Sequence, residues 1–257
     1  LSGRVRSGLG AVRDAVRGAG LRWWQLLGGV SGAYFVACQG LTVSAIGVTA
    51  FTIAVVAGQL TSGLVVDRQG IGPAGVKPVT GVRLAAAVLA VVAVTIAAIG
   101  RDSSGTQPGG AAYLLIILPA VAGLGMAWQQ AVNGRVAAVG GPLPATTVNF
   151  AVGTVALLVI EVFQLIRLGR PAHFPTEPWL YAGGAIGVLF IAVAALVVRW
   201  IGVLLLGLTS VSGQLIASVV IDVLAPSGSR LTAPVIAGCA LTLVSAAIAV
   251  IERPSRR

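Results

Sequence analysis

Residues 24–67 read WQLLGGVSGAYFVACQGLTVSAIGVTAFTIAVVAGQLTSGLVVD, and residues 179–222 read WLYAGGAIGVLFIAVAALVVRWIGVLLLGLTSVSGQLIASVVID. The two segments align over 44 residues without a gap, at a constant offset of 155 residues. We call them the first copy and the second copy. Their shared positions are Trp24 and Trp179, Gly28 and Gly183, Gly29 and Gly184, Gly32 and Gly187, Phe35 and Phe190, Ile46 and Ile201, Gly47 and Gly202, Gly58 to Leu60 and Gly213 to Leu215, and Asp67 and Asp222.

The composition places both copies in a membrane. Of the 257 residues, 57% are hydrophobic and 9% are charged, with a mean hydropathy of +0.98. A soluble domain carries about 25% charged residues. The net charge of +10 is dispersed over loops and tails. We therefore expect the chain to be embedded in the lipid bilayer and not to bind nucleic acid.

Apolar segments of about 20 residues, the length that crosses a bilayer, predict the helices. Strands are not expected, because open strand edges cannot lie in lipid. The sequence predicts an all-α polytopic membrane protein, an inverted-repeat helical bundle of the 5+5 type with about eight spans present. The expected spans are 26–44, 45–66, 81–100, 113–139, 145–166, 179–198, 201–224 and 232–251.

Five expected spans separate equivalent points of the two copies, so the second copy enters the membrane from the opposite side. Inverted repeats of this kind are typical of secondary transporters. The predicted organisation is a truncated first repeat at 1–100, a loop at 101–112 and a second five-span repeat at 113–257. If the N-terminus is cytoplasmic, thirteen basic residues lie on the cytoplasmic side and four lie outside, namely Arg101, Arg167, Arg170 and Arg230. Basic residues favour the cytoplasmic side. The sequence therefore predicts a bacterial plasma membrane protein with both termini cytoplasmic.

Two expected spans precede the second copy, but only residues 1–22 precede the first. We therefore expect the chain to lack two helices of a complete arrangement, either as a fragment or through a late start of the gene model. Residues 1–22 fit a cytoplasmic loop or a short helix at the membrane surface. The missing helices predict that the face carrying Gln130 and Asn133 borders an open cleft.

Six short motifs occur along the chain, namely Gly28-Gly29-x-x-Gly32-Ala33, Gly58-Gln59-Leu60-x-Ser62, Asp67-Arg68-x-Gly70, Pro78-x-x-x-x-Arg83, Gln130-x-x-Asn133-Gly134-Arg135 and Asn149-Phe150-x-x-Gly153. Together they resemble the YdcZ-like branch of the drug/metabolite transporter superfamily. The resemblance spans 24–251 and implies two five-helix inverted repeats that move small molecules. The second half departs from it, because Gly238 or a neighbour replaces Arg83 and no Asp-Arg-x-Gly loop follows Asp222.

Gln59 and Gln214 lie near the middle of their spans at equivalent positions of the two copies. A buried amide without a partner is costly, so each is expected to face another helix or a cavity. The pair is predicted to line a substrate site at the membrane midplane. The alternative is that each glutamine hydrogen-bonds across a helix interface.

Gln129, Gln130 and Asn133 form a second polar cluster, with Trp128 beside it. Residues three or four positions apart share one face of a helix. The cluster and the aromatic ring are predicted to bind an organic substrate. The alternative is a helix–helix contact with a tryptophan at the membrane interface.

Glu161 is a carboxylate inside an apolar run. Charged residues in spans often mark transport pathways, which makes Glu161 a candidate for proton coupling. A shallow position that reaches the outer interface is the alternative. Asp67 and Asp222 are interpreted as residues at the helix boundaries or as loop anchors.

No catalytic constellation and no metal-ligand spacing accompanies the single histidine and the two cysteines. The predicted function is a secondary transporter or exporter of small organic molecules that works by alternating access, with no enzymatic activity and no cofactor. The alternative is a non-transporting membrane protein, either an assembly partner or a remnant. The sequence is compatible with a homo-oligomer and does not identify the substrate.

Overall fold

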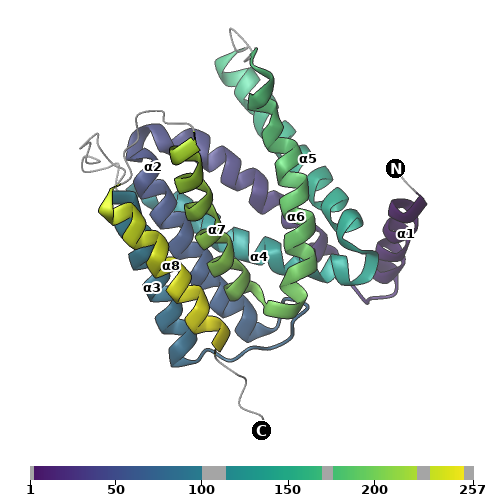
Figure 1. Cartoon of the computed structure of the whole chain (residues 1–257). Coiled ribbons are helices and arrows are strands. Elements are labelled where there is room, and N and C mark those ends of the chain that lie inside the picture. The colour runs from purple at the N-terminus through teal and green to yellow at the C-terminus, as the bar shows by residue number, and fades with distance from the viewer. Residues whose placement is uncertain (1–2, 100–113, 170–175, 225–231, 252–257) are drawn as a thin grey trace.

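The computed structural model describes residues 3–99, 114–169, 176–224 and 232–251, and every regular element in these ranges is helical (Figure 1). The 3-10 turns η1 and η3 each precede a long helix. The elements are α1 (Gly3–Arg17), η1 (Trp23–Leu26), α2 (Gly28–Gln69), α3 (Gly81–Ile99), α4 (Ile117–Gly140), α5 (Pro142–Leu168), η3 (Pro178–Tyr181), α6 (Ala182–Ile201), α7 (Val203–Leu224) and α8 (Ala233–Ile251).

Helix α2 contains the first two expected spans, which are separated by a break at Gly47. The break has φ 78° and ψ 160°. The same backbone conformation occurs at Gly202, between α6 and α7, and at Gly141, between α4 and α5. This region of backbone space is accessible essentially to glycine alone. The expected boundary at 44–45 was therefore a few residues early, and the equivalent glycines of the two copies break their helices in the same way.

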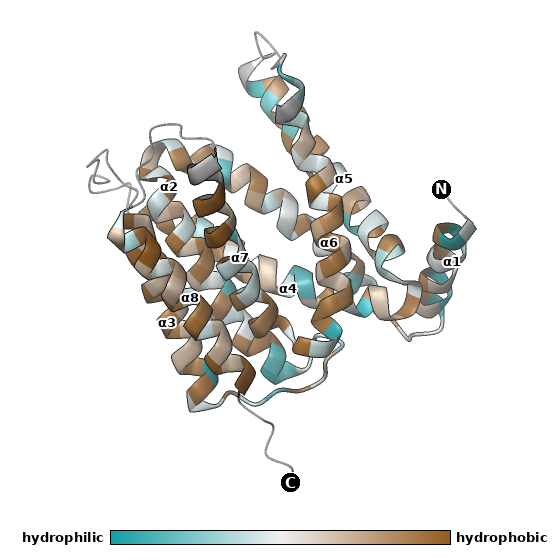
Figure 2. Ribbon diagram, in the orientation of Figure 1, coloured by the Kyte–Doolittle hydropathy of each residue, from teal (hydrophilic) through white to brown (hydrophobic). Residues whose placement is uncertain are grey.

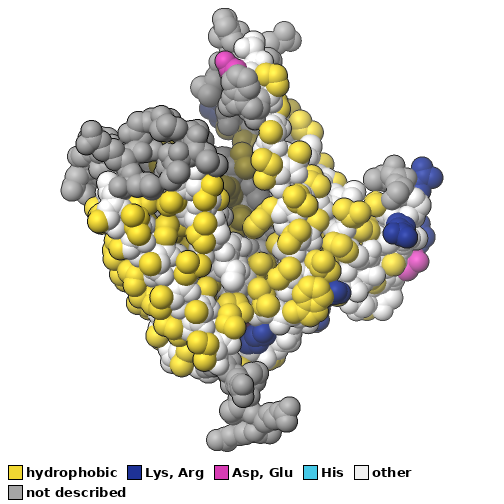
Figure 3. All heavy atoms as spheres, viewed as in Figure 1, with side chains coloured by type: hydrophobic (Ala, Val, Ile, Leu, Met, Phe, Trp, Pro, Cys, Tyr) yellow, Lys and Arg dark blue, Asp and Glu magenta, His cyan; other side chains and the backbone are white. Residues whose placement is uncertain are grey.

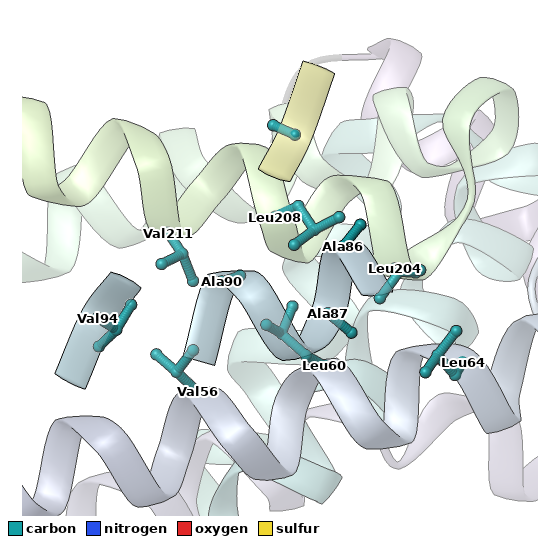
Figure 4. Packing of buried hydrophobic residues seen from close by; sticks show 11 residues of the cluster. Val56, Leu60, Leu64, Ala86, Ala87, Ala90, Val94, Leu204, Leu208 and Val211 are labelled. Atoms are coloured by element: carbon teal, nitrogen blue, oxygen red, sulfur yellow. The ribbon is translucent and has the colours of Figure 1, made fainter. Parts of the chain in front are cut away.

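The second half of α2 packs with α3, α7 and α8 around one apolar core (Figure 4). Val56, Leu60 and Leu64 lie one helical turn apart on α2 and face Leu204, Leu208 and the alanines of α3. Side chains three to four positions apart share one face of a helix, which explains this arrangement.

Helices α2 and α4 approach each other closely at two glycines. A methyl group at Gly58 would lie 2.1 Å from the Ala120 carbonyl oxygen, and one at Gly123 would lie 2.1 Å from that of Val55. Glycines of this kind let two backbones approach within a membrane. Gly58 of the first copy and Gly123 of α4 therefore let the two helices pack backbone against backbone.

The outer faces of the helices are apolar. Among the described residues, six helices are long and apolar enough to cross a membrane, and in α7 the segment 203–217 is apolar but shorter. Hydrophobic residues recur along the helices in Figure 2, and their side chains are spread over the helices on the face seen in Figure 3. On α3, for example, Leu84 and Val88 are exposed. The predicted all-α polytopic membrane protein is confirmed.

Helices α5 and α6 diverge from the bundle of α2, α3, α7 and α8 toward the upper end of the view in Figure 1. At the other end, α1 packs against α4 with Val5 and Val12 buried. Of the two interpretations of residues 1–22, the helix is confirmed for Gly3–Arg17. Its position relative to a membrane stays a prediction.

Candidate functional site

Side-chain amides from α4 and α5 meet in the interior, and we call Gln129, Gln130, Asn133 and Asn149 the amide cluster. Gln129 Nε2 donates to Asn149 Oδ1 at 3.0 Å, and Asn133 Nδ2 donates to the same oxygen at 2.9 Å. All four residues are buried. The structure therefore joins Gln129 and Asn133 through Asn149, which the sequence analysis quoted only within a motif. Gln130 is buried next to Gln129 in the sequence of α4 but makes no hydrogen bond to the other three within the described residues.

Glycines of the first copy make the space for the amide cluster. A methyl group at Gly28 would lie 2.6 Å from Asn133 Oδ1, and one at Gly32 would lie 3.3 Å from Gln129 Nε2. The amide cluster is therefore packed against α2. The expectation of an open cleft beside Gln130 and Asn133 was wrong, because the two residues are only 3% and 4% exposed. The first copy, which lies on α2, covers this face.

Gln130 has no hydrogen-bond partner for either amide atom within the described residues, and Gln129 Oε1 also has none. A buried donor or acceptor that lacks a partner costs about 1–3 kcal/mol. Such groups therefore require an explanation. A ligand that satisfies these atoms needs an N–H or O–H donor for each of the two oxygens and an acceptor for Gln130 Nε2.

Trp128 stacks on Trp24 of η1, with ring centroids 6.3 Å apart and an interplanar angle of 24°. Trp24 opens the first copy. This contact gives Trp128 a packing role against η1, whereas the alternative of a tryptophan at the membrane interface stays a prediction. A role of Trp128 in substrate binding stays a prediction.

Gln59 and Gln214 are not joined by a contact among the described residues. Gln59 is 8% exposed and lies beside α7, where a methyl group at Gly207 would be 3.7 Å from Gln59 Nε2. Gln214 is exposed and lies seven residues further along α7, or about 10 Å along the helix axis. A shared midplane site for the pair stays a prediction.

Asp67 links the end of α2 to the break between α6 and α7. Its two carboxylate oxygens accept hydrogen bonds from the backbone N–H groups of Val203, at 2.8 Å, and of Leu204, at 3.2 Å. The first N–H groups of a helix have no partner within the helix, and the N-terminus carries a partial positive charge. Asp67 therefore caps α7 from a distant part of the chain.

Two basic residues complete this arrangement, and we call Asp67, Lys77 and Arg83 the clasp. Arg83 pairs with Asp67 and donates from its other guanidinium nitrogen to the Pro78 carbonyl oxygen at 3.1 Å. Lys77 Nζ donates to the Ile201 carbonyl oxygen, at the end of α6, at 2.9 Å. Burial lowers the pKa of Lys77, Asp67 opposes this shift, and Arg83 adds to it.

The clasp agrees with the interpretation of Asp67 as a loop anchor at a helix boundary and adds its contacts with α7. Asp67 is only 2% exposed. Its carboxylate contacts Arg83 on α3 and the backbone N–H groups of Val203 and Leu204 on α7. The sequence analysis quoted Asp67, Pro78 and Arg83 as motif residues, so this part of the clasp had a signal in the sequence. No signal in the sequence indicated the contact of Asp67 with α7. The side chain of Asp222 lies outside the described residues.

Glu161 lies apart from the amide cluster, on the exposed side of α5. It lines a groove of about 540 Å³ between α5 and the first half of α2, together with Thr154, Gln164 and apolar residues such as Val36 and Leu41. No ion pair of Glu161 is found among the described residues. The predicted carboxylate is therefore in a groove, but it does not join the other candidates.

The comparisons with known proteins identify the family. No curated protein and no solved structure matches the chain. The sequence profile described as "Putative inner membrane exporter, YdcZ" matches residues 8–96 and 114–248, which covers most of the chain and spans both copies of the repeat. With apolar helices able to cross a membrane and buried amides at the contact between its two halves, the chain belongs to this YdcZ family of multi-pass inner membrane exporters.

Proposed function

We propose that this protein is a secondary exporter of small organic molecules that works by alternating access between residues 1–100 and 113–257, with both termini cytoplasmic. Membership of an exporter family supports transport. The repeated glycine breaks support a pseudo-symmetric mechanism, because Gly47 and Gly202 adopt the same conformation 155 residues apart. The amide cluster binds the substrate.

The unpartnered amide of Gln130 is the observation that carries this proposal. Gln130 is 3% exposed, and neither of its amide atoms has a partner among the described residues. A group that serves only helix packing gains nothing from this unsatisfied polarity. A substrate that hydrogen-bonds to Gln130 and to Gln129 Oε1 removes the cost in the bound state and makes binding selective.

The clasp supports the proposed mechanism because it lies at the junction between the two halves. It fixes the end of the first copy to the break in the second copy through Asp67 and Lys77. In the proposed mechanism, the clasp is the hydrogen-bonded junction between the halves that has to adopt two arrangements. Movement of the halves past each other requires the clasp to open or to rotate as a unit.

The test is uptake by inverted membrane vesicles that maintain a proton gradient. A library of labelled organic solutes is added outside the vesicles. We expect vesicles that contain the protein to accumulate at least one solute. The Gln130→Leu variant should reduce this transport at least about tenfold, because it deletes the amide and keeps a similar volume. The exposed Gln39 supplies a matched control, and the Gln39→Leu variant should transport normally.

Equal abundance of the variants in the membrane is required for this comparison. Full transport by Gln130→Leu would show that the amide only packs. Failure of the wild-type protein with every solute and with either gradient direction would favour the non-transporting alternative, in which the amide cluster joins helices.

A further inference from the structure

The groove beside Glu161 combines one carboxylate with apolar walls. Thr154, Glu161 and Gln164 are seven and three positions apart, so they lie on one face of α5. Across the groove, α2 contributes residues of its first half, such as Val36, Gly40 and Leu41. The volume of about 540 Å³ is within the usual range for sites that hold small organic ligands.

No positive charge within the described residues balances Glu161. The sequence of α2 contains no charged residue before Asp67. On α5 the only basic residue is Arg167, whose guanidinium lies 5.1 Å above the ring of Phe163. Glu161 takes part in neither of the two ion pairs, which join Arg13 with Asp14 and Arg83 with Asp67.

This asymmetry separates Glu161, which is exposed, from the buried carboxylate of Asp67. Asp67 has an arginine and two backbone N–H groups, so its charge is satisfied within the protein. An ionised carboxylate between apolar walls is costly when it has no partner. A ligand with a positive charge and an apolar body would satisfy the carboxylate and cover the walls together.

We propose that the groove between α2 and α5 binds a monovalent organic cation with an apolar body, with the Glu161 carboxylate as its charge partner. Gln164 and Thr154 provide polar atoms on either side of the carboxylate for a substituted ammonium group. Cation binding itself does not require transport, and only the assignment of the cation as a transported substrate rests on the proposed function.

Binding of radiolabelled tetraphenylphosphonium to the full chain in neutral phosphatidylcholine nanodiscs tests the proposal. Tetraphenylborate provides a probe of the same shape and opposite charge. We expect saturable binding of the cation and no saturable binding of the anion. Glu161→Gln should weaken cation binding by about tenfold or more, because it removes the charge and keeps the shape. Glu161→Asp should stay within about threefold of the wild type, because the charge remains.

Glu177 is an exposed carboxylate outside the groove, and Glu177→Gln serves as the matched control. Its binding should equal that of the wild type, and all variants should show the same thermal unfolding temperature. The proposal is overturned by equal binding of cation and anion, by unchanged cation binding in Glu161→Gln, or by the absence of saturable binding to the wild type. If the Gln130→Leu variant binds the cation normally but no longer transports, the defect concerns transport alone. The assignment of the groove as a cation site then stands.

Discussion

In the first copy of the repeat, a methyl group added at Gly29 would lie 2.0 Å from the Asn149 carbonyl oxygen, whereas at the equivalent Gly184 it would meet nothing within 4 Å. The neighbouring pair differs in the same way, because Gly28 is packed on Asn133 while Gly183 has open space around it. The same glycine motif is a helix interface in one copy and an exposed surface in the other. Sequence identity within a repeat therefore does not fix burial.

The ends of the two copies differ as well. Asp67 pairs with Arg83 in the clasp. The residue 155 positions after Arg83 is Gly238, where a methyl group would lie 2.5 Å from Ala97 Cβ and 2.6 Å from the Ala93 carbonyl oxygen. The second half uses this position to bring α8 close to α3. One repeat position thus holds an ion pair in one half and a close helix contact in the other.

The largest expected effect is the loss of the clasp carboxylate. Asp67→Ala leaves Arg83 without its partner and two backbone N–H groups without a cap, which should cost about 3–5 kcal/mol of unfolding free energy. The repeat-equivalent Asp222→Ala should cost less than about 1 kcal/mol, since no arginine stands at 238. Thermal unfolding in detergent measures both, and equal losses would contradict this difference between the copies.

The glycine faces give the next largest contrast, with opposite signs. Gly29→Ala should destabilise the fold by about 1–3 kcal/mol, because the new methyl group overlaps the backbone of α5. Gly184→Ala should be neutral or stabilising by up to about 1 kcal/mol, because alanine is the better helix former. Chemical denaturation of the two variants tests this. A comparable loss at Gly184 would show that a helix packs on the second copy.

The two glycine breaks sharpen the comparison further. Gly202→Ala and Gly47→Ala each force alanine into a backbone conformation that costs about 1–3 kcal/mol. Gly202→Ala should lower the free energy of unfolding more than Gly47→Ala does. The new methyl group at Gly202 would lie 3.0 Å from Asp67 Oδ2 and 3.1 Å from the Lys77 side chain, whereas Gly47 has open space around it. Thermal unfolding of both variants provides the measurement. A harmless Gly47→Ala would mean that the break in α2 is not maintained.

The smallest expected effect concerns pH. Burial lowers the pKa of Lys77 below its ordinary value of 10.5. Between the lowered and the ordinary pKa, the unfolded chain binds more protons than the folded one, so the unfolding free energy should rise with pH across this window. Lys77→Thr, which copies the residue 155 positions later, should lack this rise. Unfolding temperatures measured from neutral pH to pH 10.5 test this, and parallel curves would contradict it.

The amide cluster shows how far the sequence reached toward the site. The spacing of Gln129, Gln130 and Asn133 was sufficient to predict one shared helix face. Asn149 escaped notice as the acceptor for two of these amides, because the antiparallel packing of α4 on α5 brings it there. The burial of the cluster was also missed, because it depends on the fit of Gly28 and Gly32 against α4.

The sequence by itself determined the membrane environment, the helical class and the repeat. These properties follow from hydropathy and from length. The position of the break in α2, at Gly47, became clear only from the structure. Tertiary structure alone decided that Asp67 caps α7, that Trp128 stacks on Trp24, and that Glu161 lies in a groove without an ion-pair partner among the described residues. Each of these contacts joins segments far apart in the chain, and their neighbours are set by how the helices pack and not by local pattern.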